Sequence, residues 1–346
     1  VVTMKRLLNV LYVSQPDIYL SLKGDNVNLL KDGESIAKIP LLNLEGICTF
    51  GRQGISPSLM GACMEKNISI SFFSTSGRLR GRVIGMTTGN VTLRKEQYRI
   101  SDDEKKSLEI ARHMILGKIF NSESLLKRTI RDHSIRIDAV ELKRVINELK
   151  IARDKVIECE SLDELRGIEG HAASLYFSVF NHCVLQQKDE FMFKQRIRRP
   201  PTDRINALLS FGYSLLASEV ASALEGVGLD PYVGFLHRDR PGRVSLALDI
   251  MEELRPIIVD RFVLKLVNLK QLQPDDFIVK ENKTVLLKDD SRRKFIHLWQ
   301  EDKNDEITHP YLKEKIKRGL LPHAQSLLLA RYIRGDLDGY PPILIR

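Results

Sequence analysis

The spacing of apolar residues changes once along this chain, near residue 100, and this change limits the fold more than any other feature. Up to about residue 90, apolar side chains alternate or form short runs, as in IYLSLKGDNVNLLKDGESIAKIPL, where Gly24-Asp25 and Asp32-Gly33 are turn signals. This pattern predicts strands joined as hairpins. From residue 101, apolar residues recur at every third or fourth position, which predicts helices. We therefore expect an α+β protein, with a small N-terminal mainly-β domain followed by a larger all-α helical domain.

The same patterns predict where the domains begin and end. Residues 1–90 are assigned to the β-domain, 91–100 to a linker and 101–346 to the helical domain. Within the β-domain, Ser56 and Pro57 suit the cap and first turn of one helix packed on the sheet. Further helices are expected at 139–158, 168–188, 203–225, 245–269, 290–301 and 310–334.

The net charge of +9 is unevenly distributed. Residues 1–100 carry 13 Lys and Arg against 7 Asp and Glu, and a second basic cluster is KQRIRRPPTDR at 194–204. A basic surplus favours polyanionic partners such as nucleic acid. Mildly basic surfaces that bind nothing are also common, so charge alone leaves both interpretations open.

Cysteine usage and the N-terminal residues bear on the compartment. The four cysteines lie far apart and form no CxxC pair, which predicts reduced thiols and neither disulfides nor zinc ligands. The first residues lack the pattern of a signal peptide. No uninterrupted apolar run approaches the roughly 20 residues that span a bilayer. The expected compartment is the cytoplasm.

LALDIMEELRP, residues 246–256, places three carboxylates among apolar side chains. On a helix Asp249 shares a face with Glu252, three residues on, or with Glu253, four residues on. A carboxylate on a mainly buried helix is unfavourable unless it meets a cation or strong donors. Two interpretations stay open: a bound metal ion, or structural ion pairs with the nearby arginines Arg243, Arg255 and Arg261.

His237 precedes this acidic segment by twelve residues, in GFLHRDRPGR. Pro241-Gly242 predicts a turn that would bring His237 beside Asp249 and Glu252. An imidazole with carboxylate oxygens suits Mn²⁺, and Mg²⁺ to a lesser degree. A lone histidine is also often a satisfied polar residue with no ligand.

A further acid is needed to complete a metal site, and Glu169 in LRGIEGHAASLYF is the candidate. Gly167 and Gly170 on either side of it would let a backbone or a phosphate approach closely. The alternative is a glutamate near a helix N-terminus, where the helix dipole favours negative charge.

Taken together, these segments resemble the CRISPR-associated integrase family, the nuclease subunit that inserts new spacers into a CRISPR array, and most closely its type I-C branch. The resemblance runs over nearly the whole chain and depends on the order and spacing of several motifs. They are IPLLNLEGICTFGRQGISPSLMGACMEKNISISFFSTSGRLRGRV, LRGIEGHAASLYF, RRPPTDRINALLSFGYSLL, GLDPYVGFLHRDRPGRVSLALDIMEELRPIIVDRFV and GLLPHAQSLLLARYIRGDLDGYPP.

The resemblance implies a site and a reaction. The metal ligands of the family fall on Glu169, His237 and Glu252, and a supporting catalytic acid falls on Asp249, with Mg²⁺ or Mn²⁺ as the cofactor. The implied activity is that of a metal-dependent DNA integrase and endonuclease. It joins protospacer 3′-hydroxyl ends to the CRISPR repeat by transesterification, and it can also cleave branched or linear DNA.

The resemblance also implies partners. They are DNA (the protospacer and the repeat with its leader), a second copy of the chain bound through the β-domain, and a small second integration subunit. No membrane partner is implied. A non-catalytic helical nucleic-acid-binding scaffold is the alternative function.

Arginines near the expected site are candidates for DNA phosphate contacts, because guanidinium groups match phosphate oxygens. Arg78, Arg80 and Arg82 alternate on one face of an expected strand, where they either bind DNA or protect an edge strand from aggregation. The other candidates are Arg196, Arg198, Arg199, Arg204, Arg238, Arg240 and Arg243.

Overall fold

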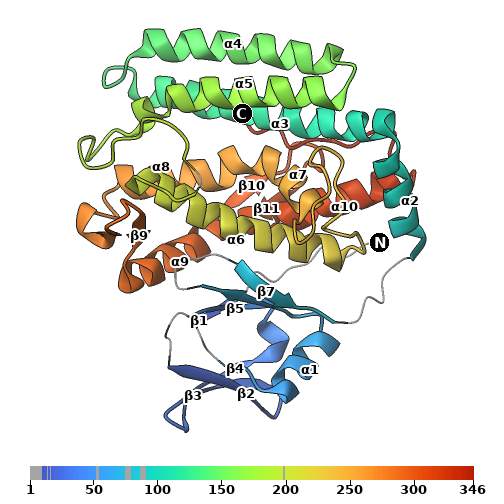
Figure 1. The fold of residues 1–346 in the computed structure, drawn as a ribbon, viewed down its shortest axis with the longest axis vertical. Helices are drawn as coiled ribbons and strands as arrows, with labels where there is room; N and C mark the ends of the chain where they lie inside the picture. The colour runs from blue at the N-terminus through green and yellow to red at the C-terminus, as the bar shows by residue number, and fades with distance from the viewer. Residues whose placement is uncertain are drawn as a thin grey trace.

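The chain folds into two parts that lie one above the other along the long axis of the molecule (Figure 1). The computed structural model describes residues 10–13, 15, 17–51, 54–74, 79–85, 91–197 and 199–346. Strands dominate the described residues up to 85, and helices dominate those from 91 onward. The α+β class predicted from the two hydrophobic periods is confirmed.

The first sheet is the predicted meander. Strands β2 (Ile18–Lys23), β3 (Asn26–Lys31) and β4 (Glu34–Pro40) pair antiparallel. The two turns hold Gly24 at φ 59° and Gly33 at φ 87°, a left-handed conformation that glycine adopts without steric penalty. The predicted hairpins are confirmed.

The second sheet combines parallel and antiparallel pairs and faces the helices. Its strand order is β1 (Val10–Val13), β5 (Gly46–Phe50), β6 (Ser69–Phe73) and β7 (Leu79–Val83), with only β7 antiparallel. Helix α1 (Pro57–Glu65) makes the crossover from β5 to β6, as parallel pairing requires. Its cap is as predicted, because Ser56 Oγ accepts a hydrogen bond from Leu59 N at 3.2 Å.

Helix α6 (Arg204–Gly226) packs against this second sheet. The rings of Phe50 and Phe211 meet edge to face, with 6.0 Å between centroids. Arg82 of β7 pairs with Glu225 of α6 at 2.8 Å. Of the three alternating arginines, Arg82 therefore joins the two parts, Arg80 is exposed, and Arg78 lies outside the described residues.

Glu219 of α6 connects the sheet to the rest of the helical part. Its Oε1 accepts hydrogen bonds from Tyr12 Oη of β1 at 3.2 Å and from Trp299 Nε1 at 3.1 Å, and it pairs with Lys303 Nζ at 2.8 Å. Trp299 and Lys303 belong to α9 (Asp289–Lys303). One carboxylate oxygen thus holds three elements together.

The linker expected at 91–100 is wrong, because these residues belong to helix α2 (Val91–Asp102). Leu93, Gln97 and Ile100 are buried at helical spacing. The Gln97 side chain donates to Asp230 O and Val233 O, both at 2.8 Å, and accepts from Asp230 N at 2.9 Å. Gln97 thus joins α2 to the segment at 230–233.

The remaining helices mostly agree with the predicted ranges. Helix α10 begins at Leu321 and not at 310, because the chain first forms a short ribbon of β10 (Glu306–Thr308) and β11 (Lys315–Lys317). A second ribbon pairs β8 (Phe277–Val279) with β9 (Val285–Leu287), so the helical part is not purely helical. The helices are α3 (Glu104–His133), α4 (Ala139–Glu158), α5 (Leu162–Ser178), α7 (Ser245–Leu254), α8 (Arg261–Asn268) and α10 (Leu321–Ile333).

Helix α6 is long and apolar enough to cross a membrane by length and composition. More than half of its most apolar stretch, 61%, is buried inside the molecule, as in the core helix of many proteins. Figure 1 shows α6 running between the sheet and the α3–α5 layer. Its apolar character is thus matched by packing within the chain.

A π-helical turn, Arg255–Asp260, joins α7 to α8, where Pro256 has no N–H to continue the regular helix. Asp260 is buried in this turn and accepts hydrogen bonds from Tyr213 Oη at 2.5 Å and Tyr176 Oη at 3.0 Å. Burial raises the pKa of Asp260 to about 6, although the two hydroxyls favour the charged form.

Replacing Glu219 by Gln should destabilise the protein by about 2–4 kcal/mol, because the buried Lys303 ammonium loses its counter-charge. Trp299 is the only tryptophan, so its fluorescence reports on this contact directly. We expect a shifted emission maximum and a lower urea midpoint. Glu225→Gln is the matched control on the same helix, and it should leave the emission unchanged. Wild-type emission and stability in Glu219→Gln would contradict the assignment.

Asp260 should make stability depend on pH. Its folded pKa lies above the value of about 3.9 in an unfolded chain, so its stabilising contribution is complete below pH 4 and is lost as pH rises through 6. Two pKa units correspond to about 3 kcal/mol. Asp260→Asn cannot titrate and should lack this loss when unfolding free energies are measured from pH 4 to 7. The exposed Asp239→Asn serves as control, and parallel curves for wild type and Asp260→Asn would refute the prediction.

Candidate metal centre

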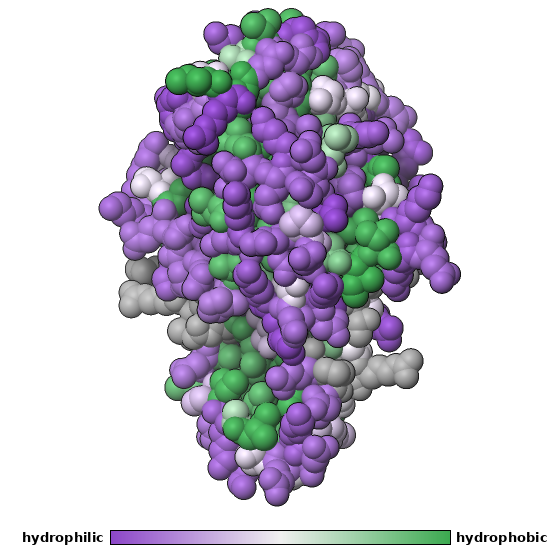
Figure 2. Space-filling model, turned by 90° about the vertical axis from the view of Figure 1, so that its left-hand side faces the viewer, coloured by the Kyte–Doolittle hydropathy of each residue, from purple (hydrophilic) through white to green (hydrophobic). Residues whose placement is uncertain are grey.

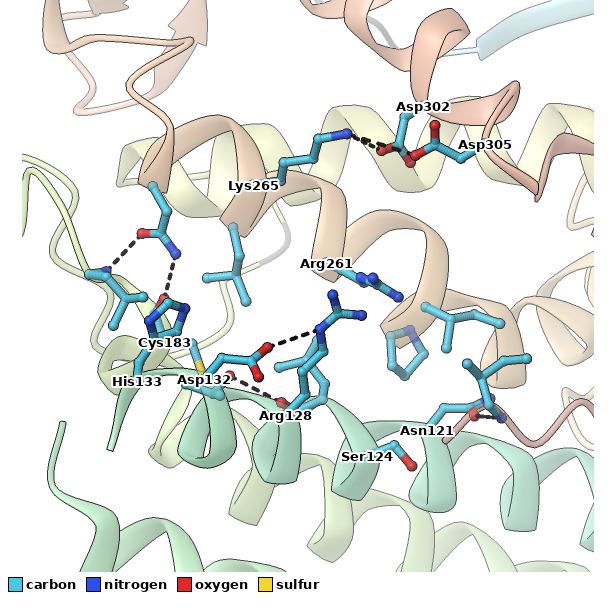
Figure 3. A pocket seen from close by; sticks show the side chains of 18 of the residues that line it. Asn121, Ser124, Arg128, Asp132, His133, Cys183, Arg261, Lys265, Asp302 and Asp305 are labelled. Atoms are coloured by element: carbon cyan, nitrogen blue, oxygen red, sulfur yellow. Dashed lines mark hydrogen bonds and ion pairs between the residues drawn. The ribbon is translucent and has the colours of Figure 1, made fainter. Parts of the chain in front are cut away.

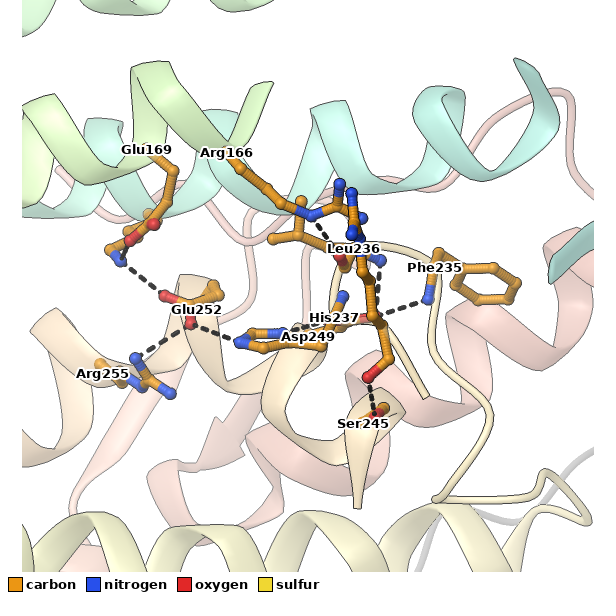
Figure 4. Close-up of polar contacts among 11 residues, drawn as sticks. Arg166, Glu169, Phe235, Leu236, His237, Ser245, Asp249, Glu252 and Arg255 are labelled. Carbon is orange, nitrogen blue, oxygen red and sulfur yellow. Dashed lines mark hydrogen bonds and ion pairs between the residues drawn. The ribbon is translucent and has the colours of Figure 1, made fainter. Parts of the chain in front are cut away.

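The three acids of α7 have different partners, and Figure 4 shows those of Asp249 and Glu252. Asp249 faces the loop at 235–237, and Glu252 faces α3 and α5. Glu253 accepts hydrogen bonds from Gln325 Nε2 at 2.9 Å and from Ile343 N at 2.7 Å, so it anchors the C-terminal segment. All three are nearly inaccessible to solvent, at 0%, 2% and 0%. Each acid therefore has a different role, although they come from a single short helix.

Asp249 fixes the loop that carries His237. Its Oδ2 accepts from the backbone N–H groups of Phe235 at 2.7 Å and Leu236 at 3.0 Å. Its Oδ1 accepts from His237 N at 3.0 Å and contacts His237 Nδ1 at 2.5 Å. A carboxylate only accepts, so Nδ1 carries the proton and the lone pair of Nε2 stays available to a metal.

Gly234 allows this loop to lie close against α7. A Cβ at this position would come within 2.7 Å of Asp249 Oδ2 and 2.9 Å of Ser245 Cβ. Any other residue would therefore push the loop and its histidine away from Asp249.

Glu169 and Glu252 both contact one lysine, and His237 lies beside Glu252. Lys118 of α3 pairs with Glu169 Oε1 and, at 2.6 Å, with Glu252 Oε2. His237 Nε2 lies 4.0 Å from Glu252 Oε1, which also pairs with Arg255 Nη1 at 2.9 Å. Side chains from α3, α5, α7 and the loop at 235–237 thus meet at one point (Figure 4).

The positive neighbours control the charge of Glu252. Burial raises the pKa of Glu252, but the charges of Arg255 and Lys118 outweigh burial, and the pKa is lowered to about 2. Glu252 is therefore a carboxylate at neutral pH. The sequence left open a structural ion pair between an acid of this segment and a nearby arginine. The structure contains such a pair, between Glu252 and Arg255.

The donor set fits a divalent cation, although the described residues contain no group of three acids or histidines close enough to form a ready ligand cluster. The Lys118 ammonium lies between the two glutamates. Glu252 Oε2 is buried and contacts this ammonium without a well-directed hydrogen bond. Two carboxylates and an imidazole nitrogen are ligands that Mn²⁺ and Mg²⁺ accept.

Lys118 and Arg166 also belong to this centre, and the sequence patterns did not predict them. Lys118 belongs to the buried stripe of α3 with Met114 and Ile115, and a lysine in such a stripe was the available signal. Arg166 Nε donates to Leu236 O at 2.9 Å and ties α5 to the histidine loop. No such contact could be read from spacing.

Two of the proposed DNA-binding arginines have partners inside the protein. Arg196 donates to Asn206 Oδ1 at 2.7 Å and to Ser210 Oγ at 3.1 Å. Arg204 donates to Glu190 O at 2.7 Å. These contacts favour a structural role, and DNA binding by both arginines stays a prediction.

The other arginines lie nearer the surface. Arg199, Arg238 and Arg240 are exposed, Arg243 is half-buried, and Arg198 lies outside the described residues. Arg238 pairs with Asp163 of α5 at 2.9 Å, so it is close to the helix that carries Glu169.

Gly167 and Gly170 leave one face of α5 open. Among the described residues, none lies within 4 Å of a Cβ built at either glycine. The sequence suggested that another backbone segment could pack closely against these two glycines. The described residues show no such contact. Room remains for a ligand beside Glu169.

Comparison with known proteins identifies the family of this chain. The family model described as CRISPR associated protein Cas1 matches residues 11–301. A CRISPR-associated endonuclease Cas1 of Chlorobaculum tepidum is 44% identical over 343 residues, covering 99% of this chain and 100% of the relative.

Two solved structures share the fold. A Cas1 protein from Thermotoga maritima has a TM-score of 0.81 at 25% identity, covering 94% of this chain and 97% of that one. A casposase bound to integration product has a TM-score of 0.83 at 24% identity, covering 98% and 95%, and this likeness speaks for the fold alone. By its sequence along nearly its whole length, this chain belongs to the Cas1 family of CRISPR-associated proteins.

Proposed function

We propose that this protein is a metal-dependent DNA integrase and endonuclease of CRISPR adaptation. The observation that carries the proposal is the hydrogen bond from His237 Nδ1 to Asp249, because it leaves Nε2 facing Glu252, at 4.0 Å from Oε1. The family membership supports it, and so does the name of the Chlorobaculum tepidum relative, a CRISPR-associated endonuclease.

In the proposed reaction a protospacer 3′-hydroxyl attacks a phosphodiester of the repeat. A new P–O bond forms, the old P–O bond breaks, and the proton lost by the attacking hydroxyl is balanced by one gained by the leaving oxygen. A Mg²⁺ or Mn²⁺ ion held by Glu169, Glu252 and His237 Nε2 would stabilise the negative charge that develops. With water in place of the hydroxyl, the same centre would cut DNA.

The residues of the chain position this chemistry. Asp249 holds the His237 ring and its loop, and Arg166 holds that loop to α5. The His237 and Glu169 side chains keep 19% and 22% of their surface exposed, so substrate can reach them. Arg199, Arg238 and Arg240 are the exposed cations placed to contact DNA phosphates.

A non-catalytic DNA-binding scaffold is the second candidate, and Lys118 is the observation that favours it. Its ammonium, with Arg255, already balances the charge of the two glutamates. Calorimetric titration with Mn²⁺ separates the two functions. A scaffold would bind DNA and show no Mn²⁺ binding that depends on Glu169 and Glu252.

We also propose a homodimer formed through the β part, and assembly with a small second integration subunit, from the family resemblance. The β part exposes large apolar side chains, including Leu42 at 81% and Ile36 at 53%. Figure 2 shows hydrophobic surface over this lower end of the molecule. Exposed apolar patches of this kind are common at interaction sites.

Replacing His237 by Ala should abolish strand joining and metal-dependent cutting, with DNA binding retained. Asp249→Asn should lower activity by about 10–100-fold, because it disturbs the orientation of a ligand and not the ligand itself. The assay is joining of a labelled 3′-hydroxyl oligonucleotide to a repeat duplex in Mn²⁺ or Mg²⁺. His171→Ala, an exposed histidine on α5, is the matched control. Undiminished joining by His237→Ala would defeat the proposal.

Leu42→Asp should weaken the dimer at least ten-fold (roughly 1.4 kcal/mol), because the interface would have to bury a charge. Sedimentation velocity over a concentration series measures this change. Ile135→Asp places the same charge on a 99% exposed residue of the helical part and should leave the dimer intact. Equal dissociation of both variants would refute the interface.

A further inference from the structure

A cavity of about 430 Å³ lies between α3 and α8, apart from the candidate metal centre. Arg128 of α3 and Arg261 of α8 enter it from opposite sides and point toward one another (Figure 3). Lys118 and Arg128 are ten residues apart on α3, which corresponds to about 15 Å along a helix axis. The cavity is therefore a separate site on the same helix.

Most charged groups in the cavity are already paired. Asp302 pairs with Arg318 at 2.5 Å and with Lys265 at 2.9 Å. Arg128 lies 3.4 Å from Asp132. Asp305 is 3.8 Å from Arg318 and 3.9 Å from Lys265. The acids that line the cavity thus have basic partners of their own.

Arg261 differs from these groups. Within the described part of the chain its guanidinium has neither an ion pair nor a hydrogen bond, and Figure 3 draws none from it. Burial and repulsion from Arg128 and Arg318 lower its pKa to about 10, and the more distant Asp302 and Asp305 offset this only in part. A half-buried guanidinium beside two others is unfavourable unless an anion joins them.

The walls of the cavity are suited to more than an inorganic anion. Leu125, Pro256, Ile257 and Leu264 form apolar surface next to the arginines. The volume lies within the range of small-molecule sites, which combine apolar walls with a few charged groups. Guanidinium groups match phosphate oxygens better than any other side chain.

We propose that this cavity binds a nucleotide, with the phosphate between Arg261 and Arg128 and the base or sugar against the apolar wall. The nucleotide is either a free mononucleotide or the terminal nucleotide of a DNA strand, since both present the same chemistry. The proposal stands apart from the metal-dependent reaction, because none of its residues belongs to that centre.

Isothermal titration calorimetry on the full chain tests the site, with deoxyadenosine 5′-monophosphate and deoxyadenosine as the paired probes. The monophosphate should bind at least ten-fold more tightly than the nucleoside. Arg261→Gln should weaken monophosphate binding at least ten-fold, and Arg128→Gln should weaken it in the same direction. Arg293→Gln removes an exposed arginine of α9 that does not line the cavity, so it should bind like wild type.

The melting temperature without ligand is a second measurement, and it shows whether Arg261→Gln still folds. Since Arg261 has no partner to lose, Arg261→Gln should keep or raise the wild-type melting temperature without ligand. Titration with a short single-stranded oligonucleotide bearing a 5′-phosphate then identifies the source. Tighter binding than the mononucleotide, lost in Arg261→Gln, assigns a strand end, and equal or weaker binding assigns the free nucleotide.

Three results would overturn the proposal. They are wild-type protein that binds no monophosphate at millimolar concentration, equal binding by wild type and Arg261→Gln, and a melting temperature of Arg261→Gln well below wild type. His237→Ala should bind the monophosphate normally whether or not the proposed integrase activity holds, so the two ideas fail separately.

Discussion

The buried carboxylate of Asp249 is the group on which the rest of the candidate centre depends. It accepts from three successive backbone N–H groups and from the imidazole of His237, all within 3.0 Å. A loop of polar backbone would otherwise sample many conformations, and its ordering is unfavourable in entropy. Four donors on one charged acceptor offset that loss, because hydrogen bonds to a buried carboxylate are stronger than neutral ones. The histidine is thereby positioned before any ligand arrives.

A single helix can support this loop, the ligand set and the C-terminal segment because its side chains radiate at about 100° per residue. Asp249 lies three residues before Glu252, which places the positioning acid beside the proposed ligand acid. Glu253 follows Glu252 directly, so it is turned by about 100° from Glu252 and contacts Gln325 and Ile343. Gly117 of α3 permits this packing, since a Cβ there would lie 2.8 Å from Glu253 Cβ.

The sequence predicted those features whose contacts are made between residues close together in the chain. The hairpins of β2–β4, the cap at Ser56 and the range of α4 follow from turn residues, capping and helical period. The pairing of His237 with Asp249 also lies within one short segment. Spacing could not reveal Lys118, which is 51 residues from Glu169, or the partners of Gln97, which hid α2. The ligand role of Glu169 came from the family resemblance and not from its local pattern, which suited a helix N-terminus equally well.

Lys118 sets the condition under which the proposed chemistry operates. Its ammonium contacts both Glu169 and Glu252, so it occupies the position between the carboxylates that a divalent cation needs. A second cation at that position would be repelled by the ammonium and would compete with it for the same carboxylate oxygens. Lysine has a long, flexible side chain, and a change of rotamer can move its charge by several ångströms. Arg255, stacked on Tyr213 with 5.2 Å between its guanidinium carbon and the ring centroid, has much less freedom and stays with Glu252. In the proposed function, the affinity for a metal would therefore depend on how easily Lys118 leaves, while Arg255 would remain paired with Glu252.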